Sequence, residues 1–120
     1  KVEDLPEILN TNIELVLGNH DLGCDINNIK IFDIRKTKNI IFSHEPVNLA
    51  DNKTLNICGH YHPKLYLKNK GDKLSFRCFA MDMKKNTLYM PAFGDLTGGY
   101  PCKKSFKKWA IISEKEILEI

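Results

Sequence analysis

The stretch LNICGHYHP, residues 55–63, decides the fold class because it joins a short apolar run to a loop rich in histidine. Residues 55–58 have the length and the composition of a buried β-strand. Gly59 comes next, and glycine allows the backbone to turn sharply and to approach a ligand closely. His60 and His62 follow, two residues apart. We therefore expect a strand that ends in a loop with two imidazole side chains.

Two earlier apolar runs end in the same way. Residues 13–17 are followed by GNHD at 18–21, and residues 40–43 are followed by His44. All four histidines of the chain thus lie in three loops, each directly after an apolar run. Open α/β sheets place their sites at the carboxyl ends of strands. We expect the three loops to meet at one edge of a sheet and to form a site there.

The remaining pattern predicts an α/β chain that is mostly β in this segment. A short helix is expected to start at Asp4. Apolar and polar residues alternate over 74–80, as in a half-buried strand. Further strands are expected over 29–34, 87–90, 109–113 and 116–120, with turns at 71–72 and 85–86. No stretch approaches the length of an apolar membrane span, so we expect no membrane partner.

The lysines are clustered, although the net charge is only +3. One group contains Lys64, Lys68, Lys70 and Lys73, and a second group lies within residues 103–108, beside aromatic side chains. Such clusters can contact phosphate groups. A solvated, lysine-rich surface is the commoner explanation, and the pattern alone favours it.

The four cysteines, at positions 24, 58, 78 and 102, form no C-x-x-C pair. Cys58 and Cys78 lie in apolar, strand-like runs, where a thiol usually behaves as a small core hydrophobe. We expect no disulfide bonds and a reduced protein that is cytoplasmic.

Taken in order, GNHD at 18–21, the Ser-His pair at 43–44 and GHYH at 59–62 resemble the later motifs of the calcineurin-like metallophosphoesterases. The resemblance implies a four-layer αββα sandwich, of which this chain would be the C-terminal half. It also implies hydrolysis of a phosphate mono- or diester with two divalent metal ions. Manganese is the metal we expect first, with iron and zinc as alternatives.

The same resemblance implies a role for each residue of the three loops. Asn19, His44 and His60 match ligands of one metal, and His62 matches a ligand of the other. His20 matches a histidine that faces the substrate, where it stabilises phosphoryl oxygens or protonates the leaving oxygen. Asp21 matches the carboxylate that orients that histidine.

Each of these residues also has an ordinary structural explanation. Asn19 is a typical turn former after a glycine. A single His44 is more often a surface or a satisfied core histidine. His60 and His62, two apart on a strand, would point to one face without any metal. The ordered combination of the three loops favours the site.

The tail of the chain is similar to one branch in particular, the ligase-associated DNA-damage-response endonucleases. This similarity rests on the motifs HP at 62–63, RCF at 77–79, PAFG at 91–94 and TGG at 97–99. It spans residue 17 to about residue 109 and implies DNA as a substrate. Arg77 is a departure, because that branch tends to carry proline before the Cys-Phe pair.

The superfamily also carries an upstream Asp-x-His and an upstream Gly-Asp-x-x-Asp, and neither occurs in this chain. We therefore expect residues 1–120 to be the C-terminal part of a single domain whose N-terminal half is missing. The second metal site would then keep only His62, and one histidine does not hold a catalytic cation. This chain alone is expected to be inactive, and its parent protein active.

Two alternatives stay open. The first is a non-catalytic binding module, in which a degenerate phosphoesterase fold recognises a protein or a nucleic acid. The second is an enzyme for small molecules, either a phosphodiesterase or a nucleotide phosphatase. The sequence upstream of Lys1 separates the first alternative from an enzyme, and assays on DNA, cyclic nucleotides and an aryl phosphodiester separate the second.

Overall fold

The computed structural model describes residues 2–18, 26–94 and 98–120, which form two β-sheets and one short helical segment. The helical segment consists of η1 (Val2–Asp4) and α1 (Leu5–Ile8). The strands are β1 (Glu14–Val16), β2 (Lys30–Phe32), β3 (Ile34–Lys36), β4 (Ile40–Ser43), β5 (Leu55–Cys58), β6 (Pro63–Asn69), β7 (Asp72–Asp82), β8 (Thr87–Tyr89), β9 (Tyr100–Pro101), β10 (Lys107–Ser113) and β11 (Glu116–Glu119).

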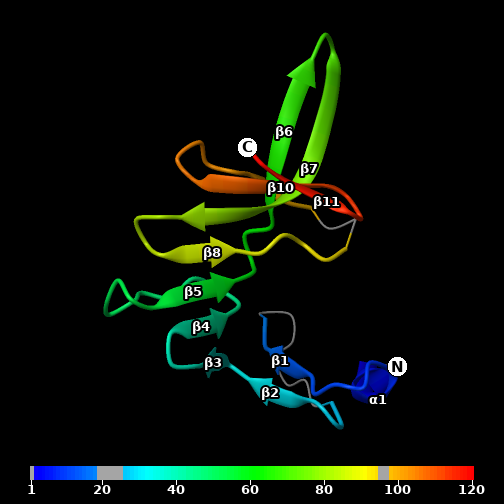
Figure 1. The fold of residues 1–120 in the computed structure, drawn as a ribbon, viewed down its shortest axis with the longest axis vertical. Helices are drawn as coiled ribbons and strands as arrows, with labels where there is room; N and C mark the ends of the chain where they lie inside the picture. The colour runs from blue at the N-terminus through cyan, green and yellow to red at the C-terminus, as the bar shows by residue number, and fades with distance from the viewer. Residues whose placement is uncertain (1, 19–25, 95–97) are drawn as a thin grey trace.

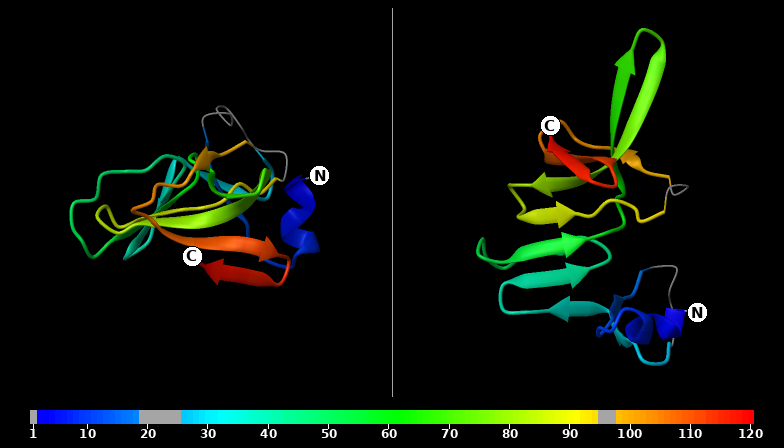
Figure 2. Two further views of the ribbon diagram at one scale, coloured as in Figure 1. Left: turned by 90° about the horizontal axis from the view of Figure 1, so that it is seen from above. Right: turned by 45° about the vertical axis from the view of Figure 1, so that its right-hand side comes forward.

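The larger sheet has the strand order β11-β10-β7-β8-β5-β4-β3, and β6 pairs with both β7 and β9. Its centre is parallel, because β5 runs parallel to β4 on one side and to β8 on the other. β1 and β2 form a separate parallel pair. Figure 1 shows this pair and α1 at one end of the molecule and the β6–β7 hairpin projecting at the other, and Figure 2 shows the same arrangement from two further sides.

The core lies on one face of the larger sheet. Cys58, Ala80, Tyr89 and Phe106 form a buried cluster, and the side chains of Tyr61 and Cys102 pack against it. The rings of Tyr89 and Phe106 stack with their centroids 5.8 Å apart and their planes 9° apart. The core thus combines small side chains of β5 and β7 with the Tyr89 ring of β8 and with the rings of Tyr61 and Phe106 from loops.

A buried asparagine ties the centre of the sheet to the loop after β4. Asn56 on β5 has no exposed surface. Its side-chain amide donates to the carbonyl of Ile41 and to the hydroxyl of Ser43, both at 2.9 Å. Its side-chain oxygen accepts from the backbone N–H of Val47 at 3.0 Å. Because a buried polar side chain is costly unless it is hydrogen-bonded, this set of bonds fixes the path of residues 43–47.

The projecting hairpin turns through Lys70 and Gly71, which have φ angles of 43° and 90°. Two consecutive residues with positive φ are typical of the tight turns that match the twist of paired strands. The turn therefore lies one residue earlier than the predicted pair 71–72. The second predicted turn, at 85–86, joins β7 to β8 as expected.

The expected fold class, an α/β segment that is mostly β, is confirmed. β4 and β5 have the bounds that the apolar runs predicted. The single strand predicted over 29–34 is wrong, because the chain leaves the small sheet at Asp33 and joins the larger sheet as β3. No helix within the described ranges is long and apolar enough to cross a membrane. Cys58, Cys78 and Cys102 are free thiols, and Cys24 lies outside the described residues.

Candidate metal centre

The parallel pairing of β4 and β5 brings two of the predicted loops together. Ser43 at the end of β4 is in register with Cys58 at the end of β5, so both strands stop at the same level. The loops stay joined one residue further, where the N–H of Gly59 donates to the carbonyl of His44 at 3.1 Å. The carboxyl ends of parallel strands meet at one edge of a sheet, and this pair follows that rule.

His44 and His60 are in direct contact at this edge. Nε2 of His44 lies 3.0 Å from Nδ1 of His60, and the rings meet edge to face with centroids 4.9 Å apart and an interplanar angle of 77°. A hydrogen bond at this separation needs one nitrogen to donate and the other to accept, and the two tautomers of neutral imidazole allow either direction. The predicted meeting of the two loops is therefore observed for these two side chains.

The spacing of the two nitrogens also suits a shared cation. A metal–nitrogen bond to histidine is about 2.0–2.1 Å long, and two such bonds at an angle of about 90–110° place the nitrogens roughly 2.9–3.4 Å apart. The observed 3.0 Å falls within that interval. Among the described residues, no group of three or more His, Cys, Asp or Glu side chains is placed to hold a metal ion. The pair is thus a two-ligand arrangement within the described part of the chain.

Glu45 is a member of this cluster that sequence reasoning missed. Its Oε1 lies 3.8 Å from Nε2 of His60, whereas His44 contacts Nδ1 of the same ring. A carboxylate on the far nitrogen of a histidine ligand selects the tautomer and orients the ring. The only sequence signal for this residue is its position next to His44, and that signal does not say which ring it reaches.

The loop after β5 has an unusual backbone at both of its histidines. His60 and His62 have φ angles of 66° and 51°, which place them in the left-handed region. Non-glycine residues adopt this region infrequently. The prediction that Gly59 makes the sharp turn is wrong, because a Cβ added to Gly59 would meet its neighbours only at ordinary contact distance, 3.9 Å, and the positive φ angles fall on the histidines instead.

Tyr61, between the two histidines, anchors this loop to the other side of the site. Its hydroxyl donates to the carbonyl of Pro101 on β9 at 2.6 Å. Its ring packs against Tyr89 and Tyr100, with centroids 5.3 and 6.0 Å away. Burial raises the pKa of the Tyr61 hydroxyl, so it stays protonated as a donor at neutral pH.

His62 directly precedes β6, whose first two residues pair with β9. The N–H of Tyr100 donates to the carbonyl of His62 at 3.2 Å. Gly99 makes this approach possible, because a Cβ at that position would lie 2.4 Å from the carbonyl oxygen of His62 and 2.9 Å from Cγ of Lys64. In the TGG motif at 97–99, Gly99 is therefore needed because a side chain would not fit there. Thr97 lies outside the described residues.

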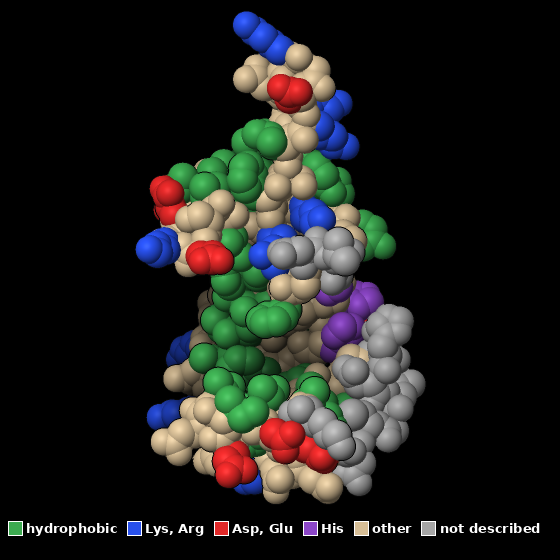
Figure 3. All heavy atoms as spheres, turned by 90° about the vertical axis from the view of Figure 1, so that its right-hand side faces the viewer, with side chains coloured by type: hydrophobic (Ala, Val, Ile, Leu, Met, Phe, Trp, Pro, Cys, Tyr) green, Lys and Arg blue, Asp and Glu red, His purple; other side chains and the backbone are tan. Residues whose placement is uncertain are grey.

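The loop of His44 opens onto a groove of about 400 Å³ that also reaches the end of β1. Its lining includes Leu17 and Gly18 from the β1 end, Asp33, and Ser43 to Val47. The described histidine side chains, in purple, lie next to one another on the face shown in Figure 3. Asn19, His20 and Asp21, which follow directly after Gly18, lie outside the described residues.

Arg77 acts as a tether for the PAFG motif at 91–94. One terminal nitrogen of its guanidinium donates to the carbonyl of Ala92 at 3.1 Å and to that of Phe93 at 2.7 Å. These bonds hold the segment after β8 against β7. Arg77, at the position where the resembling branch tends to carry proline, thus has a structural role in this chain.

Comparisons with known proteins agree with the fold. No family model and no curated protein matches this chain. A solved structure titled as that of the nuclease MPE from Pseudomonas putida is similar over 99% of this chain and 59% of its own chain, with a TM-score of 0.77 and 24% sequence identity. This chain thus spans less than two thirds of that nuclease. At this level of identity, the comparison shows that the two chains have a common fold.

Proposed function

We propose that this chain forms part of the active site of a metal-dependent phosphoesterase, and that DNA belongs to its substrates. The observation that carries the proposal is the pair of ring nitrogens of His44 and His60, 3.0 Å apart at the carboxyl edge of two parallel strands. The adjoining groove reaches Gly18, the residue before Asn19. The order of the three loops along the chain supports the same assignment.

In this proposal, Asn19, His44 and His60 hold one divalent cation, and His62 contributes to a second. Manganese fits such a set of imidazole and amide ligands. When bound, the cations supply Lewis-acid catalysis at the phosphate. Glu45, whose carboxylate lies 3.8 Å from Nε2 of His60, would favour a proton on that nitrogen and so the tautomer whose Nδ1 is free to bind.

His20 and Asp21 act on the substrate in this proposal. His20 donates a hydrogen bond to the phosphoryl oxygens or a proton to the leaving oxygen, a contribution typically worth about 10²–10⁴ in rate. Asp21 holds the tautomer of His20. The nuclease title of the structural neighbour supports a phosphodiester of nucleic acid as the substrate.

The first test is the binding of Mn²⁺ to this chain, measured by isothermal titration calorimetry. We expect His44→Ala and His60→Ala each to weaken Mn²⁺ binding at least tenfold, because each removes a ligand from one cation. Asn52→Ala, which changes an exposed residue elsewhere, serves as the control and should bind as the parent chain does. Equal Mn²⁺ affinity in the parent chain and in both histidine variants would contradict the proposal.

The second test is hydrolysis of bis-p-nitrophenyl phosphate and of a labelled oligonucleotide with added Mn²⁺, by this chain and by the full-length gene product. We expect turnover by the full-length product and little by this chain, because the two-metal mechanism needs both cations. His20→Ala in the full-length product should lower turnover much more than metal content. A full-length product that binds DNA and Mn²⁺ without hydrolysis would favour a non-catalytic binding module instead.

A further inference from the structure

The register of the β6–β7 hairpin separates its side chains into two chemically different faces. Residues directly opposite each other in an antiparallel pair lie on one face, and the face changes with every step along the strand. One face of the hairpin carries three cross-strand pairs: Lys64 with Arg77, Tyr66 with Ser75, and Lys68 with Lys73. This face has four basic side chains and one aromatic ring, and it has no acidic residue. We call it the basic face.

The opposite face of the hairpin is apolar except at the turn, where Asn69 pairs with Asp72. It carries Leu65 with Phe76 and Leu67 with Leu74. The basic residues are therefore not scattered over the hairpin, as they would be on a uniformly solvated surface. Strict segregation over three successive pairs indicates a surface with a partner.

Contacts within the basic face agree with the register. Nζ of Lys73 lies 5.0 Å from the centroid of the Tyr66 ring, a diagonal pair on the same face. Lys68 and Lys73 are exposed, and Tyr66 is half-buried. The tyrosine ring is thus flanked by lysines and presents part of its surface to solvent.

The second lysine cluster, within residues 103–108, differs because Lys107 and Lys108 are held by groups of the same chain. Nζ of Lys107 lies 3.1 Å from a carboxylate oxygen of Glu119. Nζ of Lys108 donates to the carbonyl of Phe106 at 3.0 Å. On the hairpin, Arg77 is likewise held, by the carbonyls of Ala92 and Phe93, whereas Lys68 and Lys73 are exposed and have no acidic residue beside them on their face.

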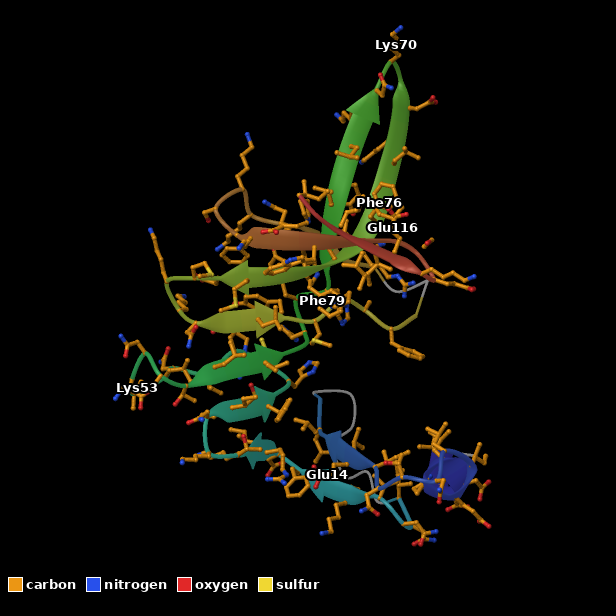
Figure 4. All side chains as sticks on the ribbon, viewed as in Figure 1. Glu14, Lys53, Lys70, Phe76, Phe79 and Glu116 are labelled. Atoms are coloured by element: carbon orange, nitrogen blue, oxygen red, sulfur yellow. The ribbon has the colours of Figure 1, made fainter. Side chains whose placement is uncertain are left out.

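The basic face leads toward the candidate metal centre. Lys64, at its lower end, is two residues after His62, and Gly99 packs closely against both residues. Lys and Arg side chains, in blue, lie on the hairpin and directly above the purple histidines on the face shown in Figure 3. Lys70, at the tip, marks the far end of the hairpin in Figure 4.

We propose that the basic face of the β6–β7 hairpin binds a single strand of nucleic acid and guides it toward the histidine loops. Lys64, Lys68 and Lys73 contact backbone phosphates, and Tyr66 stacks on a base between them. Proteins that bind single strands combine a positively charged track with aromatic side chains in this way. The guiding role rests on the function proposed above, whereas binding itself does not require hydrolysis.

An anionic membrane fits the hairpin less well. A membrane surface would take up the apolar face with Leu67 and Leu74 and leave the basic face in water. A nucleic-acid strand instead uses the lysines and the tyrosine together, because they lie on one face. The distribution of the side chains therefore favours the strand.

The test measures binding of fluorescein-labelled oligothymidylate to this chain by fluorescence anisotropy, in EDTA, at several salt concentrations. We expect Lys68→Gln/Lys73→Gln to raise the Kd at least tenfold. The slope of log K against log salt should fall by about 1.4, since each phosphate contact to a single strand contributes about 0.7. Tyr66→Leu should also raise the Kd about tenfold, whereas Tyr66→Phe, which retains the ring, should leave it within twofold.

The matched control is Lys53→Gln/Lys84→Gln, which removes two exposed lysines from other turns of the chain. Figure 4 shows Lys53 at the side of the larger sheet, well away from Lys70 at the hairpin tip. This control should bind oligothymidylate within twofold of the parent chain. Circular dichroism verifies that each variant is folded before its binding is compared.

Three results would overturn the proposal. The first is equal binding by the hairpin variant and the control variant. The second is a Tyr66→Leu variant that binds as tightly as Tyr66→Phe. The third is binding to phosphatidylserine vesicles through the hairpin without binding to oligothymidylate. The binding assay contains no metal, so a substitution that abolishes hydrolysis, such as His44→Ala, should leave oligothymidylate binding unchanged. The binding proposal can therefore be overturned while the proposed function stands, and the proposed function can be overturned while the binding proposal stands.

Discussion

At the scale of single residues, the site depends on contacts that cross between loops. His44 and His60 are 16 residues apart, yet their ring nitrogens lie 3.0 Å from each other. Their positions after apolar runs predicted a common edge, because parallel strands end together there. The sequence did not predict which nitrogens face each other, or that Glu45 stands beside His60, since both depend on the register of β4 with β5.

The buried cysteines give the stability of the chain a distinct dependence on pH. Desolvation raises the pKa of Cys58 from 9.0 to about 11 and that of Cys78 from 9.0 to about 12. Above pH 9, the unfolded chain loses these protons while the folded chain keeps them. The free energy of unfolding should therefore fall as pH rises from 9 to 10, by about 1 kcal/mol per thiol. Urea denaturation at a series of pH values measures this change.

The variant Cys58→Ala/Cys78→Ala provides the comparison for this prediction. Alanine is close in size to cysteine and has no proton to lose, so the fall in stability above pH 9 should be shallower. Lysine and tyrosine titration affects the parent chain and the variant alike. Identical pH profiles for the two proteins would show that the thiols do not contribute.

At the scale of elements, two short segments set the geometry of the loop after β5. β9 has only two residues, and it pairs with the first two residues of β6. A two-residue strand leaves no periodic pattern in the sequence, so it could not be predicted. β4 and β5 could be predicted with their bounds, because each is an apolar run that stops at a polar loop. The separation of β2 from β3 at Asp33 could not be predicted, because tertiary contacts decide that the two strands belong to different sheets.

Alanine substitutions at the adjacent residues Gly98 and Gly99 test the close approach of β9 to His62. Gly99→Ala would place a Cβ 2.4 Å from the carbonyl oxygen of His62, so the paired strands must shift. We expect this variant to lower the free energy of unfolding by about 1–3 kcal/mol, as overpacking does. Gly98→Ala is the matched control, because a Cβ there would meet none of the described residues within 4 Å.

Chemical denaturation of the two glycine variants decides the matter. The control should stay within about 0.5 kcal/mol of the parent chain, as surface substitutions usually do. Equal stability of Gly98→Ala and Gly99→Ala would mean that β9 moves away from His62 without cost. The close approach would then not require glycine at position 99.

At the scale of the whole molecule, the larger sheet has a second apolar face opposite the core. Strand register places Leu88, Met81 and Phe79 on the face opposite Cys58 and Ala80. With Leu55, Trp109 and Ile117 they line an apolar groove of about 500 Å³. Strands that are apolar on both faces are typical of the centre of an α/β sheet that is covered on both sides.

This open face should bind a dye that reports exposed apolar surface. We expect 8-anilinonaphthalene-1-sulfonate to fluoresce with the native chain, and Met83→Glu/Ile117→Glu to at least halve the signal, because negative charges in the groove repel the sulfonate of the dye. Both of these side chains are more than half exposed, so the substitutions should leave the fold intact. Phe93→Glu is the control, since Phe93 is fully exposed and lies outside the groove. Equal dye binding by all three proteins would locate the dye elsewhere.

The side chain of Asn56 has a consequence for motion as well as for stability. The amide hydrogen of Val47 is bonded to a side-chain oxygen inside the sheet, although Val47 itself lies in the loop after His44. That hydrogen can exchange with deuterium only when Asn56 releases it, and the same side chain also binds β4 at Ile41 and Ser43. We therefore expect a loop amide that exchanges as slowly as those of the central strands. Its exchange rate would report how often the histidine edge of the sheet opens.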